Sequence, residues 1–371
     1  MQRVHDTYKP RAIFEITLRH AAGWLGLVLA AQPAYASAPF AEYPLPDASG
    51  PIGIATGHDG TIWFTEAVGK IGKITPAGII AEHQTPTANS APVAITAGAD
   101  GNMWFTEENA NQIGSITPSG TITEYYIPTP DSRPYAITGG HDGNVWFTEL
   151  LGDKIGVITP GGAVTEYPVQ AGAYMIGIAD GPDGNVWFTN SGYNTVGRIT
   201  PTGVISQFAV PTRYANPSNI IGGGDGNVWF TEQGSGKIGK ITPAGAITEY
   251  NSTGTNTSPI GMTRTLDGNI WFGVAIRGNE KAIGRITPSG IVTEYPYPLA
   301  GPYTYLNAMT TDRAGNLWFT IGNHNAIGTI SPDALSGQVS VPEYTPVYLA
   351  VASGTAAAVI AYVRRRSVAG L

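Results

Sequence analysis

A short pattern of alternating apolar and polar residues recurs along most of this chain, always beside a tryptophan. The best-preserved copy is Asp-Gly-Asn-Val-Trp-Phe-Thr-Glu at residues 142–149. Related copies surround seven tryptophans, 41 to 47 residues apart: Trp63, Trp104, Trp146, Trp187, Trp229, Trp271 and Trp318. A period of this length, with a glycine-rich turn before the tryptophan, is typical of the blades of a β-propeller.

One repeat, residues 121–160, predicts four strands. Residues 121–125, 134–138, 145–149 and 154–158 alternate in polarity or are rich in β-branched and aromatic side chains. Asp142-Gly143 predicts a hairpin turn of the primed type, because glycine tolerates the positive φ that such turns require. The sequence therefore predicts an all-β fold, a seven-bladed β-propeller of four-stranded blades over residues 37–346.

Two features recur at fixed places in every blade and predict how the blades pack. The Trp-Phe pair fits a position between adjacent sheets, where aromatic rings bury most area. A glycine follows an apolar residue in the fourth predicted strand of each repeat, and we expect neighbouring blades to approach closely there. These glycines are Gly72, Gly114, Gly156, Gly197, Gly239, Gly284 and Gly328.

Two segments compete to complete the last blade. Residues 40–46 (FAEYPLP) read as an outer strand without its own blade, and residues 338–344 (QVSVPEY) read in the same way. Closure by either one removes exposed sheet edges. We prefer the N-terminal segment.

The first 36 residues predict an export signal. A basic stretch precedes the apolar residues 21–31, and Ala34-Tyr35-Ala36 is a suitable cleavage site, so the mature chain would begin near Ser37. The alternative is a short N-terminal anchor that is not removed. Eleven apolar residues are few for a membrane span, which favours cleavage.

The last residues, 347–371, predict a membrane-directed tail that contains an apolar helix. Residues 347–363 carry no charge, and Arg364-Arg365-Arg366 follows at once. With Val341-Pro342-Glu343-Tyr344 before it, this tail resembles the PEP-CTERM class of sorting signals, which exosortases and archaeosortases read. A plain transmembrane anchor is the alternative. Either way we expect an exported protein at the cell surface, anchored in the membrane or released after processing.

Composition narrows the possible partners. Only 13% of the residues are charged and the net charge is −7, which argues against nucleic acid. The chain has no cysteine, so disulfides, cysteine–zinc sites and thiol nucleophiles are excluded. We expect a monomer that binds a small molecule, a peptide, or a surface protein or glycan.

The phrase Lys-Ile-Gly-Lys-Ile-Thr-Pro-Ala-Gly-Ala-Ile-Thr-Glu-Tyr at 237–250, together with the Trp-Phe-Thr-Glu phrase, resembles the virginiamycin B lyase family. The resemblance to these streptogramin lyases covers residues 40–344. It implies an enzyme that linearises a cyclic depsipeptide antibiotic by elimination at an ester bond, with a magnesium ion and a histidine base. Such a base removes the proton α to a carbonyl, while the cation stabilises the developing negative charge.

The family's reactive residues stand mainly at the start of the innermost strands, eleven residues before each tryptophan. Those positions here are Ile52, Val93, Tyr135, Ile176, Ser218, Ile260 and Asn307. By this correspondence the family's tyrosine of blade 1 falls on Ile52, and its histidines of blades 6 and 7 fall on Ile260 and Asn307. Two family glutamates fall on Tyr305 and Gly322. We therefore predict that the catalytic set is missing, and we assign neither a catalytic residue nor a metal ligand.

Other polar residues near the predicted mouth are candidates for binding a ligand. They are Arg133, Tyr135, Ser218, Tyr305, Asn307 and His324. Aspartates four residues before most of the tryptophans would either hold metal or, as we prefer, bond to turn amides. The recurring Glu66, Glu107, Glu149 and Glu232 would line the mouth or, as we prefer, bond to loop amides.

These observations predict a virginiamycin B lyase-like exported propeller that lacks the catalytic residues and acts as a surface module for a ligand or protein. Two alternatives stay open. One is an active streptogramin-type lyase, a carbon–oxygen lyase that would require magnesium. The other is a metal-dependent propeller hydrolase or lactonase that resembles gluconolactonases.

Overall fold

The computed structural model describes residues 40–252, 257–276, 281–296 and 306–335 of the chain. The predicted signal segment 1–36, the tail 347–371, the alternative closing strand 338–344 and Tyr305 lie outside the described residues. Within the described ranges, no helix is both long enough and apolar enough to span a membrane.

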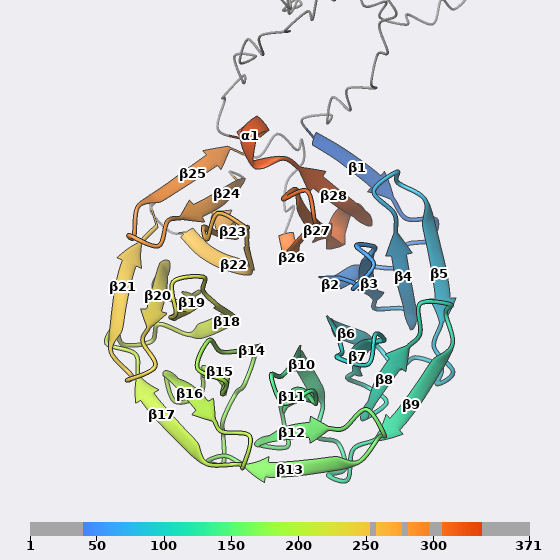
Figure 1. Cartoon of the computed structure of the whole chain (residues 1–371), viewed down its shortest axis with the longest axis horizontal. Coiled ribbons are helices and arrows are strands. Elements are labelled where there is room, and N and C mark those ends of the chain that lie inside the picture. The colour runs from blue at the N-terminus through green and yellow to red at the C-terminus, as the bar shows by residue number, and fades with distance from the viewer. Residues whose placement is uncertain (1–39, 253–256, 277–280, 297–305, 336–371) are drawn as a thin grey trace, which may run out of the picture. The chain divides into compact units, whose positions relative to one another are not determined.

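Seven antiparallel sheets of four strands each form a ring, which confirms the predicted seven-bladed propeller (Figure 1). Each blade begins with an inner strand: β2 (Pro51–Thr56), β6 (Pro92–Ala97), β10 (Pro134–Gly139), β14 (Ile178–Asp180), β18 (Pro217–Gly222), β22 (Thr257–Arg264) and β26 (Leu306–Thr311). The second strands, which carry the tryptophans, are β3 (Ile62–Glu66), β7 (Met103–Glu107), β11 (Val145–Glu149), β15 (Val186–Asn190), β19 (Val228–Glu232), β23 (Ile270–Ile276) and β27 (Leu317–Ile321).

The third strands carry the recurring glycines. They are β4 (Lys70–Ile74), β8 (Gln112–Ile116), β12 (Lys154–Ile158), β16 (Thr195–Ile199), β20 (Lys237–Ile241), β24 (Lys281–Ile286) and β28 (Ala326–Ile330). The outer strands are β5 (Ile80–Gln84), β9 (Ile122–Tyr126), β13 (Val164–Pro168), β17 (Ile205–Ala209), β21 (Ile247–Asn251), β25 (Val292–Pro296) and β1 (Phe40–Pro44). Two short helical turns, η1 (Gly322–His324) and α1 (Pro332–Leu335), complete the described elements.

The N-terminal strand closes the ring, as preferred from the sequence. β1 pairs antiparallel with β28, from Phe40 opposite Ile330 to Pro44 opposite Ala326. Asn325 supports the junction, because its Oδ1 accepts hydrogen bonds from the backbone N–H groups of Ser49 and Gly50 at 2.8 and 3.0 Å. The seventh blade is thus built from both ends of the propeller.

The hairpin turn in blade 3 differs from the predicted primed type. The predicted strands appear within one residue of their expected bounds. In the turn itself, however, only Gly143 has a positive φ, at 79°, and its N–H donates to the carbonyl of Gly140 at 3.1 Å. The hairpin loop is therefore longer than two residues, with the glycine at its end.

The tryptophans lie between blades, which confirms the packing prediction. Trp63 of blade 1 clusters with Ile95, Met103 and Phe105 of blade 2. Each tryptophan also stacks on a ring of its own outer strand, as Trp146 does on Tyr167 at 5.9 Å between centroids. Such stacked pairs contribute about 0.5–1.5 kcal/mol each beyond the area that they bury.

The recurring glycines have a different role from the one predicted. Gly156 lies opposite Phe147 in the same sheet, and a Cβ on Gly156 would come within 2.0 Å of the Phe147 ring. The ring of the blade's own second strand therefore covers the glycine. The close approach is within a blade and not between neighbouring blades.

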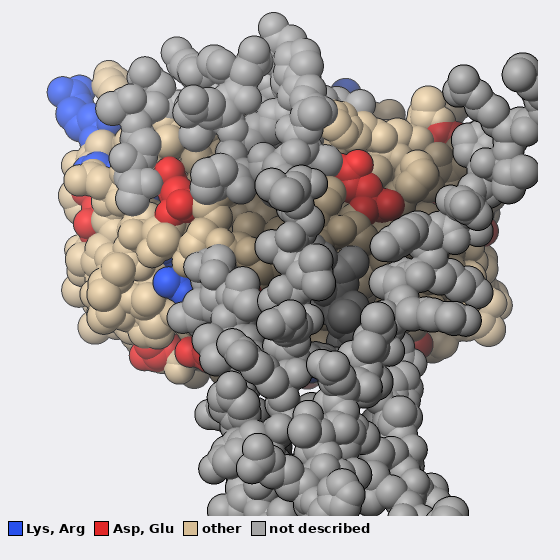
Figure 2. Space-filling model, turned by 90° about the horizontal axis from the view of Figure 1, so that it is seen from above, with Lys and Arg blue, Asp and Glu red and all other residues tan. Residues whose placement is uncertain are grey.

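Two opposite faces follow from this arrangement. We call the end where the inner strands begin the entry face; its loops include residues 108–111, 127–133, 169–177 and 210–216. The exit face is the end where the inner strands finish; its turns include residues 140–144, 181–185 and 265–269. Where described residues are visible in Figure 2, most of the surface is uncharged and the charged groups are scattered, in keeping with the sparse charge of the chain.

Candidate functional site

The structure brings two of the predicted site residues together at the entry face of blade 3. Arg133 Nη1 lies 3.0 Å from Glu108 Oε1 of the neighbouring blade. Burial raises the pKa of the adjacent Tyr135, and the nearby Glu108 and Tyr174 raise it further. Tyr135 is therefore a neutral hydrogen-bonding phenol across the physiological range, and it is not poised to act as a base.

The other predicted residues occupy different environments. Asn307 is exposed, and its Nδ2 donates to the carbonyl of Pro51 at 3.0 Å, which joins blade 7 to blade 1. His324 is half-buried at the end of η1, on the loop side of the same blade. Ser218 is only 2% exposed, so its hydroxyl does not reach the surface. Arg133 and Tyr135 therefore lie together at the entry face of blade 3, whereas Asn307 and His324 belong to blade 7.

The seven positions eleven residues before the tryptophans lie at or near the starts of the inner strands; Ile176 precedes β14 by two residues, and Ile260 is the fourth residue of β22. Four are isoleucine or valine side chains, and the remaining three are Tyr135, Ser218 and Asn307. None of these seven residues is a carboxylate or an imidazole. No group at these positions has a pKa suited to removing a proton near neutral pH.

Sequence reasoning missed three exposed tyrosines on the entry face. Tyr174, Tyr193 and Tyr214 expose 49%, 40% and 81% of their surface. The loops that hold them are fixed: the Tyr193 hydroxyl donates to the carbonyl of Ala171 at 2.5 Å, and the backbone N–H and hydroxyl of Ser191 both donate to the carbonyl of Tyr174 at 2.9 Å. We call these three residues and Tyr135 the tyrosine face, which extends over blades 3 to 5.

Tyr214 is held in a backbone conformation that tyrosine rarely adopts. Its φ is 57°, in the left-handed region, and the equivalent loops of blades 1 and 2 place Asn89 and Asp131 there with φ of 57° and 52°. Asparagine and aspartate tolerate this conformation, whereas a bulky residue is strained in it. Strain that persists at an exposed side chain is typical of a functional site. Comparison of the loops across repeats is the signal that would have found this residue.

The recurring glutamates neither line the mouth nor bond to loop amides. Glu66, Glu107, Glu149 and Glu232 are fully buried at the ends of the second strands. Apart from Glu232 Oε2, which accepts from the Ser235 hydroxyl at 2.6 Å, their carboxyl oxygens have no hydrogen-bond partner of good geometry among the described residues. The preferred sequence interpretation is therefore wrong for these residues.

Burial is the main cause of unusual titration in these glutamates. It raises the pKa of Glu107 and Glu232 to about 7 and that of Glu149 to about 8, and it also raises the pKa of Glu66. The neighbouring outer-strand carboxylate adds to each effect, as Glu166 does for Glu149. Glu107, Glu149 and Glu232 are thus largely protonated in mildly acidic solution. All four glutamates are buried at the entry-face ends of the blades, each opposite the first residue of its inner strand, as Glu149 is opposite Pro134.

The recurring aspartates serve the turns, as preferred from the sequence. Asp142 Oδ1 accepts hydrogen bonds from the Asn144 backbone at 3.1 Å and from the Trp146 indole at 3.2 Å. The described residues contain no group of three or more histidine and acidic side chains able to hold a metal. They do not supply the oxygen-rich ligand set that magnesium prefers.

Comparison with known families and structures places this geometry in context. The sequence model of the virginiamycin B lyase family matches residues 35–175 and 170–369 of this chain. A structure titled streptogramin B lyase is 37% identical, with a TM-score of 0.72, over 78% of this chain and 96% of its own. Virginiamycin B lyase from Staphylococcus aureus is 36% identical, with a TM-score of 0.72, over 78% of this chain and 98% of its own. A search of curated proteins found no match.

A further solved structure shows the same enzyme with a ligand. It is a catalytically inactive variant of the Staphylococcus aureus lyase with quinupristin, 36% identical, with a TM-score of 0.72, over 78% of this chain and 98% of its own.

Proposed function

Because this chain belongs to the virginiamycin B lyase family, we propose that it keeps the family's propeller as a binding module and has lost the lyase reaction. The ligand is a small molecule or peptide of the streptogramin kind, a compact ring that bears aromatic groups. The observation that supports this proposal is that none of the seven positions eleven residues before the tryptophans carries a carboxylate or an imidazole.

The chemistry of the entry face supports binding without elimination. Elimination requires a base that removes the proton next to the ester carbonyl and a group that stabilises the resulting negative charge. Arg133 is cationic, but Glu108 already pairs with it. Exposed tyrosines, in contrast, offer flat surfaces for aromatic groups and hydroxyls for the amides of a peptide ring. The tyrosine face suits recognition better than catalysis.

The identity to streptogramin lyases favours the alternative of an active lyase, so the first experiment separates the two. Purified residues 37–346 would be incubated with a type B streptogramin and magnesium, and the products resolved by chromatography and fragment mass analysis. We expect saturable binding and an intact ring, while an authentic lyase opens it in parallel. Ring-opened product above the enzyme-free control would overturn the proposal, and absence of binding would reject this ligand class.

The Tyr214→Asn variant tests the tyrosine face directly. We expect stability to rise by about 0.5–1 kcal/mol, because asparagine tolerates a positive φ better than tyrosine does. Affinity for the streptogramin should fall about fivefold, since one aromatic contact of about 1 kcal/mol is lost. Thermal unfolding and calorimetric titration measure the two effects.

The matched control is Tyr126→Asn, which removes an equally exposed tyrosine, at 78%, from the end of the outer strand β9. Its affinity should stay unchanged. If both variants bind alike, or if Tyr214→Asn binds as the unmodified protein does, the tyrosine face is not the binding site.

The proposal also places the module outside the cytoplasm and at the cell surface. The predicted signal at 1–36 and the apolar, arginine-flanked tail at 347–371 support this location. Fractionation of cells that express the full chain, followed by protease treatment of intact cells, would test it. Protein that stays in the cytoplasm would refute it.

A further inference from the structure

The exit face carries a second site that the proposed function does not use. A groove of about 500 Å³ crosses this face from blade 3 to blade 6, and a hollow of about 550 Å³ adjoins it between blades 5 and 6. Arg264, the last residue of β22, lines both. The corresponding ends of the other inner strands carry no positive charge: Thr56, Ala97, Gly139, Asp180, Gly222 and Thr311.

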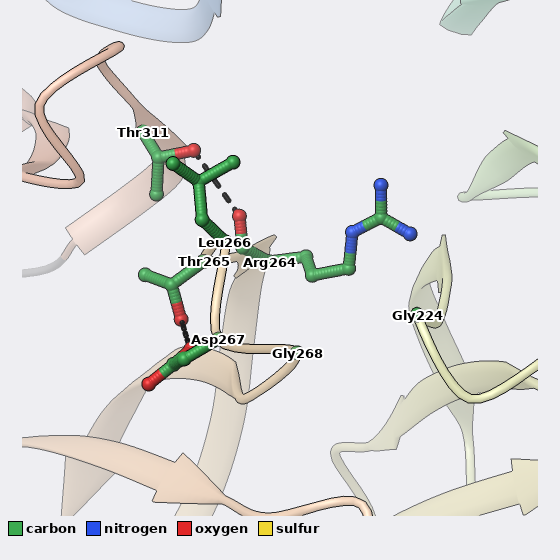
Figure 3. Close-up of a pocket in the computed structure, with 7 residues that line it drawn as sticks. All are labelled: Gly224, Arg264, Thr265, Leu266, Asp267, Gly268 and Thr311. Atoms are coloured by element: carbon green, nitrogen blue, oxygen red, sulfur yellow. Dashed lines mark hydrogen bonds between the residues drawn. The ribbon is translucent and has the colours of Figure 1, made fainter.

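The Arg264 guanidinium extends away from its own strand and toward the turn that contains Gly224 (Figure 3). Its only hydrogen bond to the described residues is a long one, 3.4 Å from Nη1 to the carbonyl of Gly222. No carboxylate among the described residues forms an ion pair with it, although Asp267 lines the same hollow. The guanidinium therefore retains donors for a ligand in the two cavities that Arg264 lines.

The carboxylate at the opposite end of the groove already has hydrogen-bond partners. His141 Nδ1 lies 2.5 Å from the carboxylate of Asp180, whose Oδ1 also accepts from the His141 backbone at 3.2 Å. The one acidic group in the groove is thus held by its own partner and does not compete for Arg264. Between these ends, the hydroxyl residues Thr138 and Thr263 and the glycines at 222 and 223 leave room for a small molecule.

We propose that this groove binds an oxyanion, a carboxylate or phosphate group, of a small metabolite or peptide terminus through Arg264. The planar guanidinium presents paired donors that match two oxygens of such a group, and charge-assisted hydrogen bonds of this kind are the strong ones. The remainder of the ligand lies along the groove toward His141 and Asp180. This site is on the face opposite the tyrosine face, so it does not depend on the proposed function.

Titration of the protein with inorganic phosphate and with acetate, at constant ionic strength, tests the site. We expect a saturable rise in the midpoint of thermal unfolding with at least one of the two anions. The anion that binds more tightly identifies the kind of group that the natural ligand carries. A rise that fails to saturate, or no rise, overturns the proposal.

Three variants identify the residue responsible. Arg264→Gln should weaken binding at least tenfold, and Arg264→Lys should weaken it several-fold, because lysine keeps the charge without the paired donors. Arg313→Gln is the control: Arg313 is also an exit-face arginine, but its guanidinium donates to the carbonyl of His58. Equal losses of anion affinity in Arg264→Gln and Arg313→Gln would mean that general surface charge attracts the anion. This result would overturn the proposed site.

Discussion

Replacing Gly156 with alanine should destabilise the propeller by about 3 kcal/mol, the upper end of the usual cost of overpacking a core. The added methyl would lie 2.0 Å from the ring of Phe147, which is fully buried and has no room to move. Either the ring leaves its position between blades or the third strand separates from the second. Denaturant unfolding of purified protein measures the loss as a lower midpoint.

A nearby glycine supplies the control for this experiment. Gly161→Ala lies in the turn after the same strand, where the nearest neighbour of the added methyl is Thr159 Oγ1 at 3.8 Å. Its stability should stay within about 0.5 kcal/mol of the parent. Adding Phe147→Leu to Gly156→Ala should recover part of the loss, because the clash is with the ring. Additive losses in the double variant would contradict this account.

Glu149→Gln should remove the contribution of one titrating group from the pH dependence of the free energy of unfolding. Burial and the Glu166 carboxylate raise the pKa of Glu149 to about 8, whereas its unfolded value is near 4.5. The native state therefore holds a proton that the unfolded state has released, so the free energy of unfolding falls as the pH rises from about 4.5 to 8. In the middle of this window the slope attributable to this group is about 1.4 kcal/mol per pH unit. Above pH 8 it disappears.

The neighbouring Glu166 stays ionised across this window. Burial alone would raise the pKa of Glu166, but hydrogen bonds from Lys154 and Thr129 outweigh burial and lower it. A neutral amide at 149 avoids the conflict between the buried carboxylate of Glu149 and the half-buried carboxylate of Glu166. Blade 4 has neutral amides at both equivalent places, where Asn190 Nδ2 donates to Gln207 Oε1 at 3.2 Å.

Chemical denaturation at pH 5 and pH 8 would measure the effect. The variant and its parent should be about equally stable at pH 5, where Glu149 is protonated. At pH 8 the variant should be more stable by about 3 kcal/mol. Glu108→Gln changes an entry-face carboxylate for which no such gain is expected. Equal slopes for the parent and Glu149→Gln would show that Glu149 is ionised in the native protein.

The fold was predictable because each blade repeats the same local signals. The tryptophan spacing determined the number of blades, and the alternation around residue 145 located its strands to within one residue. Closure by the N-terminal strand was also predicted correctly. The role of Gly156 was not, because a sequence does not show which ring, in the same sheet or the next, lies over a missing side chain.

The candidate site was predictable only in part. The tryptophan register identified the inner-strand starts, and with them Tyr135 and Asn307. It gave no sign that Ser218, in β18, would be buried, because that depends on how the folded blades pack. It gave no sign that Tyr214 would stand exposed, because that depends on the path of an irregular loop. The aspartates were interpreted correctly since their turn is local. The glutamates were interpreted wrongly, because the residues that surround their side chains come from three strands of a folded blade.

The pairing of β1 with β28 also determines the order in which the molecule can be assembled. Residues 40 and 330, which are opposite each other in the last blade, are separated by nearly the whole propeller sequence. Blades 1 to 6 draw all their strands from consecutive chain, so each can form as soon as its segment is available. The last sheet must wait for β26–β28, and the entropy of bringing such distant segments together makes its completion the slowest contact to form. While a ribosome or a translocation channel releases this chain gradually, the part already released would form an incomplete ring. Its two sheet edges would stay unpaired until the final blade emerges.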